Sequence, residues 1–114
     1  MMKVSIRQIN GITVLDLNGR ITLEEGSMVL RDTVRELLGQ GQKKILLQLG
    51  EVTAIDSSGI GELVNAYTTV RAQGGELKLL NLSEKVQDLL QITKLHMVFD
   101  ISGEEAAALA SFSV

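Results

Sequence analysis

The sequence of 114 residues contains no cysteine, no proline and no tryptophan, and its only histidine is His96. Without cysteine, the chain has no disulfides, no zinc–thiolate sites and no thiol nucleophiles. A single imidazole also makes a multi-histidine metal site or a Ser-His-Asp hydrolase difficult to build. Because aromatic residues are only 3% of the chain, the core is predicted to be aliphatic. We therefore expect a protein that is not an enzyme and that carries neither a metal nor a cofactor.

The chain also lacks a strong charge of either sign, with 11 basic and 14 acidic side chains. The acidic excess lies in residues 100–114. A nearly neutral body gives no electrostatic footprint for nucleic acid. The longest apolar run covers only residues 106–110, whereas a membrane span needs roughly 20 residues. Residues 1–5 do not resemble a signal peptide, so we expect a soluble, cytoplasmic protein with no membrane insertion.

The length of the chain fits a single domain over residues 1–114, and the first elements are predicted to form a β-hairpin. Residues 4–9 and 12–17 are β-branched, partly alternating runs. Asn10-Gly11 between them is a pair that tolerates the left-handed angles of a type I′ turn. Asn18-Gly19 is predicted to end the second strand.

Helical and strand patterns alternate after the hairpin. Thr22-Leu23-Glu24-Glu25 has the form of a capping box at the start of a helix that Gly39 and Gly41 end. The later elements are predicted as follows: a buried strand at 44–49, a one-sided helix from near Ser58 to Gly74-Gly75, a strand at 76–81, a helix capped by Ser83, a short strand at 97–101, and a final helix after a second capping box at 102–105. The predicted order is β-β-α-β-α-β-α-β-α. This order indicates the α/β class: one mixed, mostly parallel sheet with an N-terminal β-hairpin and about four helices.

The segment Asp56-Ser57-Ser58-Gly59-Ile60-Gly61 lies where the buried strand leads into the one-sided helix. In open α/β sheets, ligands and modifications gather at such carboxyl ends of strands. Free backbone N–H groups and the positive end of the helix dipole favour an anion there, including a phosphate attached to a serine. Simple N-capping by Asp or Ser is the alternative interpretation. Two glycines, each of which lowers helix propensity by ~1 kcal/mol, suggest that something approaches the backbone closely.

The chain resembles the STAS domain family and, within it, the free-standing bacterial anti-sigma factor antagonists. The resemblance extends over nearly the whole chain and is carried by three segments: the Asp-Ser-Ser-Gly-Ile-Gly of residues 56–61, the Gly-Gly-Glu-Leu-Lys-Leu-Leu of residues 74–80, and residues 83–90. Two positions depart from the family pattern. Ile21-Thr22 replaces a common Leu-Asp, and Thr93-Lys94-Leu95 replaces a common glycine, so Lys94 would have to adopt a left-handed turn at a cost of ~1 kcal/mol.

The resemblance implies that Ser57 is a phosphorylation site, with Ser58 as the adjacent fallback. It further implies that residues 56–61 contact a partner protein kinase that is also an anti-sigma factor, and that a phosphoserine phosphatase reverses the modification. The first alternative is a constitutive STAS-type subunit of a signalling scaffold or a lipid-transport complex. A small hydrolase using Ser57 or Ser58 with His96 is a weaker alternative, since no G-x-S-x-G motif is present. Met28 is predicted to fill the core rather than to line a partner-binding groove.

Overall fold

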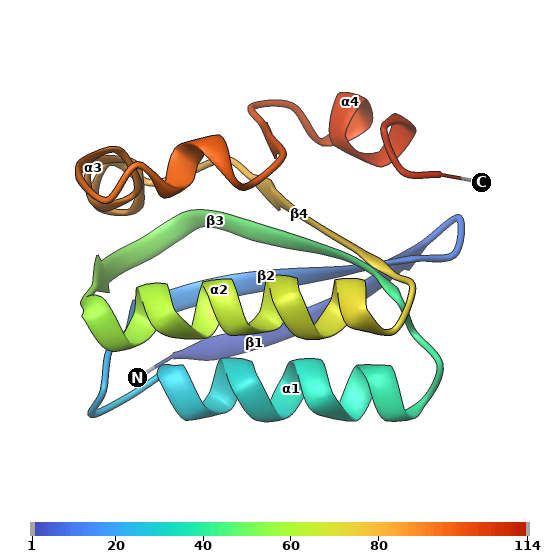
Figure 1. Ribbon diagram of the computed structural model, residues 1–114, viewed down its shortest axis with the longest axis horizontal. Helices are drawn as coiled ribbons and strands as arrows, with labels where there is room; N and C mark the ends of the chain where they lie inside the picture. The colour runs from blue at the N-terminus through green and yellow to red at the C-terminus, as the bar shows by residue number, and fades with distance from the viewer. Residues whose placement is uncertain (1, 114) are drawn as a thin grey trace.

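A computed structural model describes residues 2–113, which form one sheet with helices on both of its faces (Figure 1). The strands are β1 (Lys3–Ile9), β2 (Ile12–Ile21), β3 (Lys44–Ile55), β4 (Glu76–Leu80) and β5 (Ile101–Ser102). They lie side by side in the order β1-β2-β3-β4-β5. β1 pairs antiparallel with β2, and every later pair is parallel. The predicted mixed sheet with an N-terminal hairpin is therefore confirmed.

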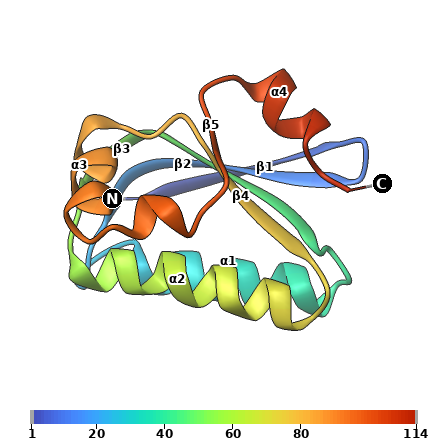
Figure 2. The same cartoon turned by 45° about the horizontal axis from the view of Figure 1, so that its top comes forward.

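The helices are α1 (Ser27–Gly39), α2 (Ser57–Ala72), α3 (Glu84–Ile92) and α4 (Glu105–Ala110), and a short 3-10 helix, η1 (Leu95–Met97), follows α3. α1 and α2 lie side by side against one face of the sheet, whereas α4 covers the opposite face (Figure 2). Both α1 and α2 begin at the edge of the sheet where the parallel strands end (Figure 1). The element order and the α/β class agree with the prediction.

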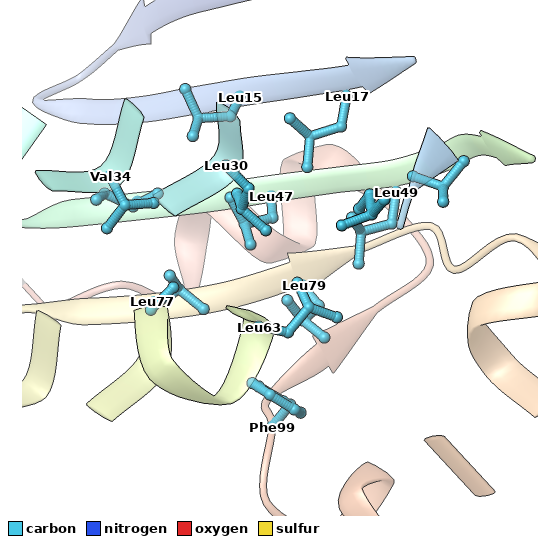
Figure 3. Close-up of a cluster of buried hydrophobic side chains, with 14 of the residues drawn as sticks. Leu15, Leu17, Leu30, Val34, Leu47, Leu49, Leu63, Leu77, Leu79 and Phe99 are labelled. Atoms are coloured by element: carbon cyan, nitrogen blue, oxygen red, sulfur yellow. The ribbon is translucent and has the colours of Figure 1, made fainter. Parts of the chain in front are cut away.

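Two apolar clusters hold these layers together, and both are mainly aliphatic. The larger cluster joins α1, α2 and α3 to the sheet, and Figure 3 shows part of it around Leu47, Leu63 and Leu79. On α2, the side chains of Leu63 and Val70 are fully buried. The smaller cluster joins α4 to the other face through Ala108 and Phe112. The large cluster fixes the position of α2, and therefore the position of the residues at its start.

The hairpin turn forms as predicted, but the second strand is longer than predicted. Asn10 and Gly11 have φ angles of 53° and 81°, as a type I′ turn requires. β2 does not end at Asn18-Gly19 but continues to Ile21. The register between β2 and β3 shifts at two places in this stretch. These irregularities accommodate Gly19 within β2, and the strand continues past it.

The start of α1 also differs from the prediction. Thr22 Oγ1 accepts a hydrogen bond from the backbone N–H of Glu25, as a capping box would. However, residues 23–25 form a turn, and the helix begins only at Ser27. Gly26 causes the delay: its φ is 92°, and a Cβ there would lie 1.9 Å from the carbonyl oxygen of Arg20. The end of α1 at Gly39 agrees with the prediction.

The C-terminal third departs from the prediction at two elements. The strand expected at 97–101 is β5, which has only two residues and follows η1. Lys94 has a φ of 60°, so it adopts the left-handed conformation that the missing glycine would require. The second capping box is wrong as well, because the carboxylate of Glu105 accepts a hydrogen bond from Arg7 of β1 instead of bonding the start of its own helix.

Candidate functional site

The candidate site lies at the carboxyl ends of β2 and β3, where the N-termini of α1 and α2 meet. Residue 56 separates the end of β3 from the first residue of α2. Asp56 has an extended backbone and is the N-cap of α2. The sequence offers both Asp56 and Ser58 as caps of this helix, and the structure assigns the cap to Asp56. Ser57 and Ser58 are therefore the first two helical residues.

The carboxylate of Asp56 joins two segments that are far apart in the sequence. Its Oδ1 accepts a hydrogen bond of 3.0 Å from the backbone N–H of Gly59, inside α2. Its Oδ2 accepts a second bond of 3.0 Å from the N–H of Leu23, in the turn between β2 and α1. These N–H groups, first that of Leu23 and then that of Gly59, lower the pKa of Asp56 below its usual value. The side chain thus remains ionised and holds the turn against the helix.

The two glycines of the site have different surroundings. A Cβ at Gly59 would lie 2.1 Å from the carbonyl oxygen of Ile21, so only glycine lets α2 pack so closely on β2. At Gly61 no atom lies within 4 Å of the same position. The close approach that the sequence suggests therefore occurs at Gly59, where the neighbour is the chain's own backbone. Gly61 is exposed to solvent.

The two serine hydroxyls also differ in their environment. Ser57 is exposed at the start of α2. Ser58 is half-buried, and its Oγ donates a hydrogen bond of 2.9 Å to Oγ of Ser27, the first residue of α1. Ser27 is itself buried. Of the two candidate phosphorylation sites, Ser57 thus has the accessible hydroxyl, and Ser58 bonds α1 to α2.

Exposed apolar side chains lie in the turn before α1 and at the start of α1, next to the start of α2. The side chain of Leu23 is 77% exposed, and those of Met28 and Val29 are 61% and 44% exposed. Leu23 adjoins the site through its bond to Asp56, and Met28 follows Ser27. The expectation that Met28 fills the core is therefore wrong. We call Leu23 and Met28 the apolar rim of the site. The helical spacing of α1 places Leu30, Val34, Leu37 and Leu38 on its buried face, as the structure shows, and Met28 lies outside that face.

Not all of residues 56–61 are accessible. Gly59 is buried, and Ile60 is only 7% exposed because it packs into the larger apolar cluster. Asp56, Ser57, Ser58 and Gly61 have some access to solvent. His96 lies on η1, and its Nδ1 is 3.4 Å from the carbonyl oxygen of Leu90. Within residues 2–113 it makes no hydrogen bond with either serine of the site.

Comparison with known proteins assigns this arrangement to a family. The STAS domain model matches residues 3–108, and the chain belongs to the STAS domain family. The anti-sigma-B factor antagonist of Bacillus subtilis is 34% identical over 103 residues, which are 90% of this chain and 93% of that protein. The anti-sigma F factor antagonist of Paenibacillus polymyxa is 23% identical over 99% of this chain and 97% of its own length. The resemblance stated from the sequence is therefore confirmed.

Solved structures show the same fold. A crystal structure from Thermotoga maritima, of a protein classed with the anti-sigma factor antagonists, has a TM-score of 0.88 and is 26% identical, covering 96% of this chain and 93% of that one. The phosphorylated form of the Bacillus protein SpoIIAA, which is 21% identical, has a TM-score of 0.70 over 95% and 96% of the two chains. The second likeness concerns the fold alone. Among residues 2–113, no helix is long and apolar enough to cross a membrane.

Proposed function

We propose that this chain is an anti-sigma factor antagonist: it binds an anti-sigma factor and thereby releases the sigma factor that the anti-sigma factor holds. The observation that carries the proposal is the exposed hydroxyl of Ser57 beside the apolar rim. An apolar surface around a small polar centre suits protein–protein binding. The relatives named as antagonists match this chain over almost its full length, which supports the same role.

The proposed partner is also a serine kinase, and its action on Ser57 ends the binding. The kinase transfers the γ-phosphoryl group of ATP to Oγ of Ser57; Oγ loses its proton and ADP leaves. A phosphoserine carries about −1.5 to −2 charges. Burying that charge next to the ionised Asp56 and against the apolar rim would weaken an interface by several kcal/mol. A phosphoserine phosphatase restores the binding form, and the proposed location of the cycle is the cytoplasm.

The start of α2 accommodates the modification without refolding. Ser57 is the first residue of the helix, where the helix dipole favours an anion. Because Asp56 and Gly59 already fix this turn, we expect the same backbone before and after phosphorylation. The proposed switch therefore changes the charge of the surface rather than the fold. SpoIIAA, which shares this fold, has been solved in both unphosphorylated and phosphorylated forms.

The test is affinity capture of the chain from its own cell extract, with and without ATP, followed by mass analysis of the captured and the free protein. We expect an anti-sigma factor to bind without ATP and a phosphate-sized mass increase on Ser57 with ATP. Ser57→Ala should keep the binding and lose the mass increase, whereas Ser58→Ala, its matched control, should keep both. Phosphorylation of Ser57→Ala but not of Ser58→Ala would move the acceptor by one residue. If a bound partner never phosphorylates the chain, the switch is wrong and the constitutive-subunit alternative replaces it.

A further inference from the structure

The contact between the first halves of α1 and α2 contains two polar pairs, one helical turn apart. The first pair is Ser27 with Ser58, whose hydroxyls are 2.9 Å apart. Arg31 and Glu62 come four residues later in their helices, and they form the second pair. Because four residues are about one turn, or roughly 5.4 Å of helix, the Arg31–Glu62 pair lies just beyond the serine pair along the same contact.

The Arg31–Glu62 pair is poorly satisfied. Nε of Arg31 and Oε2 of Glu62 are 4.0 Å apart, which is too far for a hydrogen bond. Both atoms are buried, and within residues 2–113 neither has a hydrogen-bond partner. A buried polar atom without a hydrogen bond costs free energy, so the contact between Nε and Oε2 stabilises the fold little. The guanidinium of Arg31 can therefore bind a better acceptor if one appears within its reach.

The geometry of α1 directs the side chain of Arg31 toward the candidate site. Long side chains on a helix lean toward its N-terminus, which for Arg31 is the turn that contains Ser27. α1 and α2 begin next to each other at this end (Figure 1), so the positive ends of two helix dipoles meet there. The nearest carboxylate, that of Asp56, is already bonded to the N–H groups of Leu23 and Gly59.

We propose that Arg31 is the intramolecular ligand of a phosphoryl group on Ser57. In the phosphorylated chain the guanidinium leaves Glu62 and donates hydrogen bonds to the phosphate oxygens, for which its planar fork is well suited. The ligand class is a phosphate monoester dianion. The inference rests on the proposed function only in the choice of Ser57 as the modified residue. Its consequence is that phosphorylation also changes the contact between α1 and α2, next to the apolar rim.

The test installs phosphoserine at position 57 during translation, so it needs no kinase. Phosphorus NMR then follows the second pKa of the phosphate in the full chain. The charged groups on the elements that meet here are Asp56 and Glu62 at the start of α2, Arg31 of α1, Glu24 and Glu25 of the turn before α1, and Arg20 of β2, which pairs with Glu25. A guanidinium that contacts the phosphate favours the dianion. Arg31→Gln should therefore raise this pKa by roughly half a unit or more.

Arg35→Gln is the matched control, because it makes the same change on α1 one turn further from Ser57. It should shift the phosphate pKa much less than Arg31→Gln does. In the wild-type chain, the Nε–H proton resonance of Arg31 should also move downfield on phosphorylation. If the two variants shift the pKa equally, or if the Arg31 resonance does not move, the inference is wrong.

The double variant Arg31→Gln/Glu62→Gln keeps the test valid if Arg31→Gln alone folds poorly, because it leaves no unpaired charge between the helices. Compared with Glu62→Gln, the double variant should also raise the phosphate pKa; an unchanged value would overturn the inference. A kinase that never modifies Ser57 would overturn the proposed function and leave this NMR result intact. Conversely, a working kinase with equal shifts in Arg31→Gln and Arg35→Gln would overturn the inference alone.

Discussion

At the scale of single residues, Asp56 and Gly59 decide where Ser57 lies. Asp56 bonds both the turn before α1 and the first turn of α2. Gly59 lets α2 approach the carbonyl oxygen of Ile21. Together they place Ser57 at the surface, beside the apolar rim. A helix cap and a close backbone contact thus account for two residues that the motif alone would assign to partner binding.

Gly59→Ala and Gly61→Ala should have opposite effects on stability. The new methyl group at residue 59 would lie 2.1 Å from a backbone oxygen, so α2 must shift, at a cost of about 1–3 kcal/mol. At residue 61 the space is open, and alanine should stabilise the helix by up to ~1 kcal/mol. Urea unfolding of both variants measures the difference. Equal effects would contradict the close packing of α2 on β2.

The ionised form of Asp56 should make the stability depend on pH. Its pKa in the folded chain is lowered from an unfolded value of about 3.9. Its contribution is therefore fully present above about pH 4 and is lost as the pH falls through the folded pKa. Asp56→Asn should destabilise the chain more at pH 7 than at pH 3, as unfolding curves at the two values would show. Asp88→Asn, at an exposed position of α3, is the control, and a pH-independent loss in Asp56→Asn would contradict this account.

At the scale of elements, each helix is held by a different kind of contact. α2 presents Leu63, Ala66 and Val70 to the large cluster. α4, with only six residues, relies on the smaller cluster and on Arg7, which bonds Glu105 and also Asp16 of β2. The carboxylates raise the pKa of Arg7, and the bond from Arg7 lowers the pKa of Glu105. α2, whose first residues belong to the candidate site, is thus held by the larger of the two apolar clusters, and α4 by the smaller one.

Leu63→Ala should test the orientation of α2. Leu63 is fully buried beneath the helix, so its truncation should lower the free energy of unfolding by about 2–5 kcal/mol. Thr68→Ala changes an exposed residue of the same helix and should stay within about 0.5 kcal/mol of the wild type. Chemical denaturation measures both. A loss below half a kcal/mol for Leu63→Ala would mean that α2 presents another face to the sheet.

At the scale of the whole molecule, the sequence predicted the arrangement of elements better than their ends. Alternating apolar patterns predicted the mixed sheet and the order of the helices, since burial imposes those periods. The predicted starts of α1 and α4 are wrong, because Thr22 and Ser102 form hydrogen bonds with the local backbone of turns and do not cap the helices. A local motif does not show that the backbone of Gly26 packs against the carbonyl oxygen of Arg20, or that the carboxylate of Glu105 accepts a hydrogen bond from Arg7. Both contacts depend on tertiary structure.

The residues of the candidate site also fall into two groups: those that the sequence predicts, and those that only tertiary packing brings to the site. The Asp-Ser-Ser-Gly segment was recognised because residue types that cap helices and accept phosphate lie together in sequence. Ser27 was not recognised, because it reaches Ser58 only through the packing of α1 beside α2. The apolar rim was missed for the same reason, and it determines where a partner is expected to bind.

Leu23→Ser should therefore weaken binding of the captured anti-sigma factor at least tenfold, since exposed apolar anchors at the centre of an interface dominate its affinity. Leu23 is 77% exposed in the free chain, so its replacement should change the stability by no more than about 0.5 kcal/mol. Ile92→Ser is a closely matched control, because Ile92 is 78% exposed but lies on α3, away from the apolar rim. Titration calorimetry of the unphosphorylated proteins gives both affinities. If Ile92→Ser weakens binding and Leu23→Ser does not, the partner docks on α3. A charge on Ser57 would then have to act through the contact between α1 and α2, because Ser57 would lie outside the interface.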